Sequence, residues 1–227
     1  MKNYLYKELS KQCDPNDFMG QVKRTVNGKP VSEDQIKMIV ESIEAGLKLE
    51  KEDILFDLGC GNGALSVLLF DKIKKYVGVD FSEYLIEIAQ THFEKQNFSF
   101  SYAEASEYLR NEKVNDQFTK GLCYGTFSYF EKKNVHEILA NIRKKYVNLR
   151  TFYIGNIPDK DRASSFFYKD IDYSRLIEDD QSSIGVWWSK EEFKLLAANT
   201  GWQIEFYEMP QNFYSAHYRF DVILSAK

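Results

Sequence analysis

The hydrophobic residues of this chain switch between helical spacing and short continuous runs. Apolar residues at helical spacing predict an amphipathic helix over 32–47, and Ser32 with Gln35 predicts a capping box at its start. A short apolar run at 54–58 then ends in a glycine cluster, and a second helical pattern follows over 65–73. The simplest interpretation of this segment is strand, turn and helix.

The same alternation continues along the chain. Further strands are predicted at 76–80, 98–103, 118–124 and 151–155, and further helices at 85–93 and 135–142. Strands that alternate with helices indicate a parallel sheet covered on both faces.

The C-terminal part of the chain has a different pattern. Ser189 and Glu192 predict a capping box for one more helix, which stops at Gly201. Two final strands, 203–207 and 219–224, are joined by a loop too short for a crossover helix, so they should be antiparallel. The expected fold class is therefore α/β: a doubly wound, Rossmann-like, seven-stranded and mostly parallel sheet with an antiparallel C-terminal strand.

The 227 residues fit one α/β domain better than two independent cores. We expect a single domain over 1–227, in which residues 1–31 form an N-terminal cap segment. Residues 156–188 are polar and aromatic without regular periodicity, and they are interpreted as an insertion or lid over the acceptor site.

Composition narrows the function. Thirty basic and thirty-four acidic residues give a net charge of -4, which disfavours nucleic acid as a partner. The three cysteines are widely spaced, which suggests reduced thiols rather than a disulfide framework or a metal site. With no signal-peptide core and no membrane span, we expect a cytoplasmic protein, monomeric or homodimeric, that acts on a small molecule.

The glycine cluster after the first predicted strand is the clearest chemical signal. Asp57, Gly59, Gly61 and Gly63 alternate with other residues at the point where the strand turns toward a helix. Backbone N–H groups and a helix N-terminus there would suit an anionic or zwitterionic group, and glycines let a ligand approach the backbone. Gly59 to Ala64 also satisfies the dinucleotide-binding pattern, so this loop alone does not choose between cofactors.

Two more strand ends complete the pattern of a nucleoside site. Asp80 closes the next strand, where a carboxylate can accept both hydroxyls of a ribose. Glu104 follows the strand after that and can meet the exocyclic amine of an adenine. With these acids, residues 35–227 resemble the class I S-adenosylmethionine-dependent methyltransferase family, whose acid and three alternating glycines match those of the loop.

The resemblance implies roles for individual residues. Asp57 and the glycines would surround the methionine part of the cofactor, and Arg24, in a segment that often folds over the cofactor, would pair with its carboxylate. Cys60 is expected to pack within the loop rather than act as a nucleophile, because no histidine adjoins it. The expected cofactor-binding residues are Asp57, Gly59, Cys60, Gly61, Gly63, Asp80, Phe81, Glu104, Ala105, Cys123 and Arg24.

Three other functions stay open at this point. An NAD(P)-dependent oxidoreductase would use the same loop, and a non-catalytic cofactor-binding domain could keep it. A nucleic-acid methyltransferase is disfavoured because residues 124–127 replace the Asn/Asp-Pro-Pro-aromatic motif.

The acceptor site should lie at the carboxyl ends of the strands. We expect Tyr124, Asn156, Tyr218 and Arg219 to bind the acceptor, and His217 and Tyr129 to be the catalytic candidates, without a metal. Residues 156–162 and 218–222 look like those of small-molecule methyltransferases found with bacterial surface-polysaccharide enzymes. That resemblance implies transfer to an oxygen of a small polar or phosphorylated metabolite, and it points to capsule or surface-polysaccharide biosynthesis.

Overall fold

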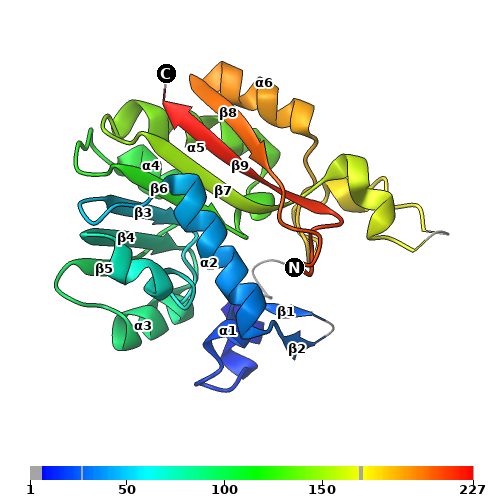
Figure 1. The fold of residues 1–227 in the computed structure, drawn as a ribbon, viewed down its shortest axis with the longest axis horizontal. Helices are drawn as coiled ribbons and strands as arrows, with labels where there is room; N and C mark the ends of the chain where they lie inside the picture. Colours follow the sequence, from blue (N-terminus) through cyan, green and yellow to red (C-terminus); the bar gives the residue numbers. More distant parts are fainter. Residues whose placement is uncertain (1–6, 27, 169–170, 227) are drawn as a thin grey trace.

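A seven-stranded sheet runs through the molecule in the order β5-β4-β3-β6-β7-β9-β8 (Figure 1). The computed structural model describes residues 7–26, 28–168 and 171–226. Strands β3 to β7 are parallel, and β9 is antiparallel to both β7 and β8. The sheet strands are β3 (Ile54–Leu58), β4 (Lys75–Asp80), β5 (Phe98–Tyr102), β6 (Lys120–Tyr124), β7 (Thr151–Pro158), β8 (Trp202–Tyr207) and β9 (Arg219–Ala226).

Helices cover both faces of this sheet. The α-helices are α1 (Phe18–Gln21), α2 (Glu33–Leu47), α3 (Glu83–His92), α4 (Ala105–Asn111), α5 (Lys132–Lys145) and α6 (Lys190–Thr200). The 3-10 helices are η2 (Leu9–Gln12), η3 (Ser66–Lys72), η4 (Phe127–Tyr129), η5 (Lys160–Ser165) and η6 (Leu176–Glu178). A separate hairpin pairs β1 (Thr25–Val26) with β2 (Lys29–Pro30).

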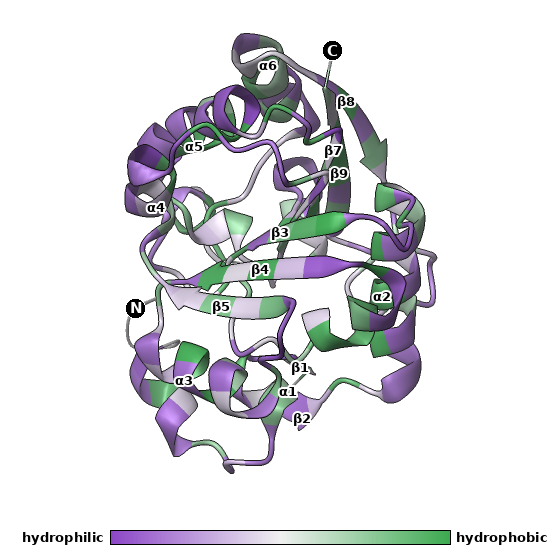
Figure 2. Ribbon diagram, turned by 90° about the vertical axis from the view of Figure 1, so that its left-hand side faces the viewer, coloured by the Kyte–Doolittle hydropathy of each residue, from purple (hydrophilic) through white to green (hydrophobic). Residues whose placement is uncertain are grey.

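The core consists of two hydrophobic clusters, one on each face of the sheet. One cluster joins α4, α5 and α6 to the sheet, and the other joins α2, η3 and α3 to it. Figure 2 shows α4 and α5 on one side of the strands and α2 on the other. Both faces of the central strands are therefore buried, as expected for parallel strands between helices. The predicted fold class is confirmed.

Two local predictions were wrong. The segment after the glycine loop is the 3-10 helix η3 rather than an α-helix, so the helix-dipole contribution expected at the loop is smaller. Ser32 precedes α2, but its side chain makes no capping hydrogen bond. The Gln35 side chain instead donates to the Asn212 carbonyl (3.2 Å) and accepts from the Tyr214 backbone N–H (2.8 Å). The C-terminal loop therefore takes the group that a capping box would need.

The segment expected as an insertion begins later than predicted, because β7 continues through Asn156 to Pro158. Its two ends are close together: Lys160 N–H donates to the Trp188 carbonyl (3.0 Å) and Trp188 N–H to the Pro158 carbonyl (3.0 Å). Between them, η5 and η6 project from the body of the molecule (Figure 1) and share a small core around Trp187. Residues 169–170 of this segment lie outside the described residues.

The N-terminal segment is bound to the glycine loop. The Asn62 side chain donates to the Phe18 carbonyl (2.8 Å) and to Gln21 Oε1 (2.9 Å), and the Ser10 hydroxyl donates to the Gln21 carbonyl (2.8 Å). Asn62, Gln21 and Ser10 are fully buried. Residues 1–6 and 27 of the segment expected as a cap lie outside the described residues.

Candidate active site

A cavity of about 970 Å³ lies at the carboxyl ends of the parallel strands. Its wall comes from residues 22–26, from the glycine loop, from the ends of β4 to β7, and from parts of the insertion and the loop before β9. Small-molecule pockets commonly measure about 300–1,000 Å³, so this cavity has room for more than one small ligand.

The glycines of the loop are required by the backbone and by neighbouring protein atoms. Gly59 and Gly61 have φ angles of 81° and 58°. A Cβ on Gly59 would come within 2.3 Å of the Thr126 side chain, and one on Gly61 within 2.9 Å of Val22. Thr126 also donates its hydroxyl to the Gly59 carbonyl (3.0 Å). Close packing against the segments on either side therefore accounts for these glycines without a ligand.

Asp80 holds the same loop from the end of β4. Its Oδ2 accepts from the Gly61 N–H (2.9 Å) and its Oδ1 from the Ser82 N–H (2.9 Å). An ionised carboxylate has about four acceptor positions, so each oxygen can still take a ligand hydroxyl. Burial raises the pKa of Asp80 to about 6, while the backbone N–H groups act to lower it. Asp80 thus both shapes the loop and presents free acceptor positions to the cavity.

Asp57 is bound by two side chains that sequence reasoning missed. Its Oδ2 accepts from the Ser66 hydroxyl (2.5 Å) and from the Tyr76 hydroxyl (2.8 Å). Burial raises the pKa of Asp57 to about 6, and the two hydroxyls partly offset this effect. No sequence motif points to Ser66 or Tyr76, since only the fold brings them together beneath the loop.

Most residues expected at the site line the cavity. Gly63 and Cys123 do not. A Cβ on Gly63 would come within 2.7 Å of Phe100, so this glycine serves packing. Cys123 is fully buried in the cluster beneath α5, because alternate side chains of a strand point to opposite faces. The cavity-lining residues among those predicted are Arg24, Asp57, Gly59, Cys60, Gly61, Asp80, Phe81, Glu104, Ala105, Tyr124, Tyr129, Asn156, His217, Tyr218 and Arg219.

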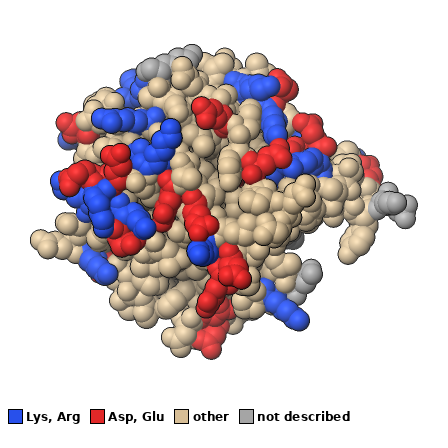
Figure 3. Space-filling view, viewed as in Figure 1, with Lys and Arg blue, Asp and Glu red and all other residues tan. Residues whose placement is uncertain are grey.

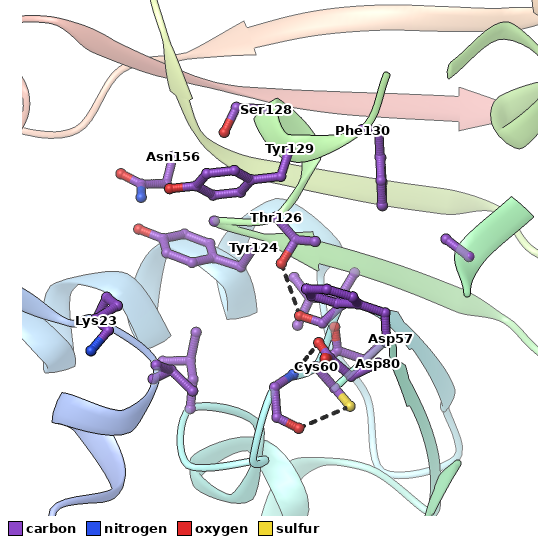
Figure 4. A pocket seen from close by; sticks show the side chains of 18 of the residues that line it. Lys23, Asp57, Cys60, Asp80, Tyr124, Thr126, Ser128, Tyr129, Phe130 and Asn156 are labelled. Atoms are coloured by element: carbon purple, nitrogen blue, oxygen red, sulfur yellow. Dashed lines mark hydrogen bonds between the residues drawn. The ribbon is translucent and has the colours of Figure 1, made fainter. Parts of the chain in front are cut away.

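The end of the cavity away from the glycine loop is lined by aromatic side chains and an amide. Figure 4 shows the Tyr124, Tyr129 and Asn156 side chains gathered on one side, away from Asp57 and Asp80. The Tyr124 hydroxyl and Asn156 Oδ1 are buried and have no hydrogen-bond partner in the described part of the chain. Tyr129 donates its hydroxyl to the Ser183 carbonyl (2.6 Å), which joins this end of the cavity to the insertion.

The loop before β9 completes this end of the cavity. The His217 ring is exposed and lies 4.7 Å from the ring of Tyr218. The Arg219 guanidinium lies 4.9 Å from the centroid of the same Tyr218 ring and donates to the Asn156 carbonyl. The predicted acceptor and catalytic residues are therefore brought to one place, opposite the acids.

Comparison with known proteins identifies the domain. Residues 55–146, from β3 to just beyond α5, match the family model described as "Methyltransferase domain". These matched residues form a class I S-adenosylmethionine-dependent methyltransferase domain. A solved S-adenosylmethionine-dependent methyltransferase from Clostridium acetobutylicum has the same fold, with a TM-score of 0.65, 15% identity, and coverage of 93% of this chain and 98% of that one.

Curated relatives match about half of the chain. A probable cobalt-precorrin-6B C(15)-methyltransferase (decarboxylating) of Methanococcus vannielii is 29% identical over 121 residues, which are 51% of this chain and 66% of the relative. A ubiquinone biosynthesis O-methyltransferase of Pelagibacter ubique is 34% identical over 110 residues, which are 45% of this chain and 43% of the relative. The chain thus spans less than two thirds of the length of these relatives.

The methyltransferase domain uses S-adenosylmethionine as its cofactor, and the expected cofactor is confirmed. The geometry of the cavity fits this molecule: Asp80 retains acceptor positions for ribose hydroxyls, and Glu104 lies beyond it on the same wall. The family match also decides between methyltransferase and dinucleotide-dependent oxidoreductase for the glycine loop. Among the described residues, no helix is both long and apolar enough to span a membrane.

One further group at the methyltransferase site was missed from the sequence. Asp221 of β9 is buried, and it accepts from the Tyr153 hydroxyl (2.5 Å) and from the Asn156 N–H (2.6 Å). Ser42 shares a hydrogen bond of 2.7 Å with the same tyrosine hydroxyl. Asn156 has a φ of 66°, so Asp221 helps to hold a strained backbone at the cavity wall. The sequence signal that could have identified Asp221 is an acidic residue inside an otherwise apolar strand.

Proposed function

We propose that the protein transfers the methyl group of S-adenosylmethionine to an oxygen of a small polar or phosphorylated metabolite. The observation that carries this proposal is the division of one cavity into an acidic end beside the glycine loop and an aromatic, amide-lined end beside Tyr124 and Asn156. The first end suits the nucleoside of the cofactor, and the second has room for an acceptor in line with it.

The chain's residues are assigned to three tasks in this reaction. Asp57, Asp80, Glu104 and Arg24 bind and orient the cofactor, whose sulfonium supplies an activated methyl group. Tyr124, Asn156, Tyr218 and Arg219 orient the acceptor. His217 removes the proton of an acceptor hydroxyl, and Tyr129 is the second catalytic candidate.

The insertion is proposed to act as a lid. Val186 N–H donates to the Ser128 carbonyl (2.7 Å), and Phe166, Ser183 and Ile184 contribute to the cavity wall. A segment in this position excludes water from the reacting atoms. Together with the N-terminal cap segment, it belongs to a single domain over 1–227.

A small acceptor is preferred over nucleic acid for an electrostatic reason. The net charge is -4, and on the face shown in Figure 3 basic and acidic side chains are interspersed rather than segregated. We also propose action in the cytoplasm, supported by three cysteines that form no disulfide. The resemblance of residues 156–162 and 218–222 to enzymes of surface-polysaccharide pathways supports a role in capsule or surface-polysaccharide biosynthesis.

The proposed function is tested by a transfer assay. The protein is incubated with S-adenosylmethionine labelled in its methyl group and with pools of hydroxy acids, sugar phosphates, neutral sugars and bulk RNA. We expect label in a small-molecule pool. Label in RNA would make the protein a nucleic-acid methyltransferase, and cofactor binding without transfer to any pool would favour a non-catalytic domain.

The role of His217 has its own test in the same assay. His217→Ala should lower kcat by a factor of about 10²–10⁴, the usual contribution of general acid–base catalysis, and should leave cofactor affinity unchanged. His92→Ala, in α3 and outside the cavity wall, is the matched control. An unchanged kcat in His217→Ala removes this residue from the chemistry.

A further inference from the structure

Two arginines at the cavity lack a carboxylate partner. Arg24 and Arg219 both line the cavity, and neither forms an ion pair with any carboxylate of the described residues. Arg24 Nε is buried without any hydrogen-bond partner. Uncompensated cations at a buried wall are costly unless a ligand supplies the opposite charge.

The two arginines belong to different segments of the cavity wall. Arg24 follows Val22, which packs on the glycine loop at Gly61, and its charge acts on Asp57. Its guanidinium lies 4.8 Å from the centroid of the Tyr124 ring, so Arg24 stands between the glycine loop and the acceptor residues. Arg219 begins β9 and donates to the Asn156 carbonyl, on the side of the acceptor residues.

Within the described residues, no carboxylate forms an ion pair with Arg219. The nearest acid along β9 is Asp221, and its two oxygens already accept from the Tyr153 hydroxyl and the Asn156 N–H. The groups that act electrostatically on the guanidinium include the phenols of Tyr218, Tyr129 and Tyr214. Phenol hydroxyls therefore lie around Arg219, and the Asp221 carboxylate, whose pKa burial raises and the Arg219 charge acts to lower, stays outside ion-pair contact with the guanidinium.

Tyr124, which lines the same cavity and feels the charge of Arg219, adds a hydrogen-bond donor. Its side chain is 5% exposed, and its hydroxyl has no partner. Burial raises the pKa of Tyr124 well above its usual value, so this hydroxyl keeps its proton and can donate. A buried tyrosine hydroxyl normally has a partner, which marks this one as reserved for a ligand.

We propose that Arg219 and Tyr124 form a recognition site for an oxyanion, a carboxylate or a phosphate, on the methyl acceptor. A guanidinium gives an oxyanion two parallel donors, and the phenol gives a third. This inference rests on the proposed function, and it narrows the acceptor from polar metabolites to anionic ones.

Asn156 further limits which functional groups the acceptor can carry. Its unpartnered Oδ1 repels an oxyanion but accepts from a hydroxyl. A molecule that carries an oxyanion and a hydroxyl, such as a hydroxy acid or a phosphorylated alcohol, satisfies Arg219, Tyr124 and Asn156 together. Neutral sugars leave the arginine without a counter-charge.

The test measures anion binding to the protein saturated with S-adenosylhomocysteine, so that the cofactor's own carboxylate already occupies its site. Inorganic phosphate and acetate are titrated separately at constant ionic strength, with chloride as the balancing salt, and the thermal unfolding midpoint is recorded. The same titrations are run without S-adenosylhomocysteine. The variants are Arg219→Gln, Arg219→Lys and Tyr124→Phe, with the exposed Arg150→Gln as the matched control.

We expect a saturable rise of the midpoint in the wild type and in Arg150→Gln. In Arg219→Gln the apparent Kd should increase about 10- to 100-fold, as for loss of a charge-assisted hydrogen bond, with a smaller increase in Tyr124→Phe. A response to phosphate alone or to acetate alone supports the site and identifies its anion. Equal responses of the wild type and Arg219→Gln, or no response to either anion, overturn the proposal.

The outcome is separable from that of the proposed function. S-adenosylhomocysteine binding without an anion effect removes the oxyanion site and leaves methyl transfer in place. Anion binding that needs Arg219 in a protein without affinity for S-adenosylhomocysteine keeps the site and removes the proposed reaction. Unchanged S-adenosylhomocysteine affinity in Arg219→Gln and Arg219→Lys shows that these variants are folded.

Discussion

Three buried aspartates define the site at the scale of single residues. Asp57, Asp80 and Asp221 each have a pKa raised to about 6 by burial, although hydrogen bonds from neighbouring groups act in the opposite direction. Asp57 and Asp80 were predicted because they lie at strand ends beside a glycine loop. Asp221 was not, because only the pairing of β9 with β7 brings it to Tyr153 and Asn156.

Asp80→Ala should weaken S-adenosylhomocysteine binding. The change removes acceptors for ribose hydroxyls and also the bonds that hold the Gly61 and Ser82 N–H groups. Charge-assisted hydrogen bonds suggest a loss of about 1.5–3 kcal/mol. Calorimetric titration measures it, with the exposed Asp34→Ala of α2 as a control. Wild-type affinity in Asp80→Ala would exclude this residue from the cofactor site.

Cofactor affinity should also depend on pH through the same residue. Asp80 accepts hydrogen bonds best when ionised, and its pKa is about 6. Lowering the pH from about 7.5 to about 5 should therefore weaken binding, because protonation removes the charge. Calorimetry at several pH values checks this, and Asp80→Asn should flatten the dependence. An affinity that is constant across this range argues against an ionised Asp80 in the complex.

At the scale of elements, hydrophobic spacing predicted most of the fold, and it failed where tertiary contacts determine the local structure. A segment of seven residues is too short for apolar spacing to separate a 3-10 helix from an α-helix, so η3 was predicted as α-helical. Gln35 fits a capping box in sequence but is bound by a loop far along the chain. The Ser189 and Glu192 capping box was confirmed, since Glu192 Oε2 accepts from the Ser189 N–H while the distant Lys132 binds the other carboxylate oxygen.

The insertion should loosen independently of the sheet. Trp187 is 1% exposed and packs against the rings of Phe166, Phe167 and Tyr218. Trp187→Ala removes the centre of this small core, at a cost of about 3–5 kcal/mol for a buried tryptophan. We expect faster proteolysis within 160–186 and a raised acceptor KM, with cofactor affinity near wild type.

Limited proteolysis followed by mass mapping locates the cleavage sites. Tyr168→Ala is the matched control, because this aromatic residue of the same insertion is 84% exposed. Uniform cleavage across the sheet in Trp187→Ala would show that the insertion and the domain unfold as one unit.

At the scale of the whole molecule, the buried carboxylates make stability depend on pH. The folded pKa of each of these aspartates, about 6, lies above the ordinary value of 3.8. Between pH 3.8 and about pH 6 the folded state therefore binds more protons than the unfolded state. The stability that these groups contribute at low pH is lost as the pH rises through about 6. The order of the strands and the place of Asp221 beside Tyr153 and Asn156 could not be predicted from local pattern.

The thermal unfolding midpoint should rise as the pH is lowered from about 7.5 to about 5.5. Asp221→Asn should reduce this dependence, because one of the three contributing groups no longer titrates. Each group is expected to contribute about 1–3 kcal/mol across the transition. Calorimetric unfolding scans measure the midpoint. A midpoint that falls as the pH is lowered over this range would contradict the assignment of raised pKa values.

The central claim is that the cavity at the carboxyl ends of β3 to β6 binds S-adenosylmethionine. Isothermal titration of the purified protein with S-adenosylmethionine, S-adenosylhomocysteine, NAD and NADP tests it most directly. We expect saturable heat with both S-adenosyl compounds, lost or weakened in Asp80→Ala, and none with the dinucleotides. Saturable binding of NAD or NADP, with no heat from either S-adenosyl compound, would contradict it.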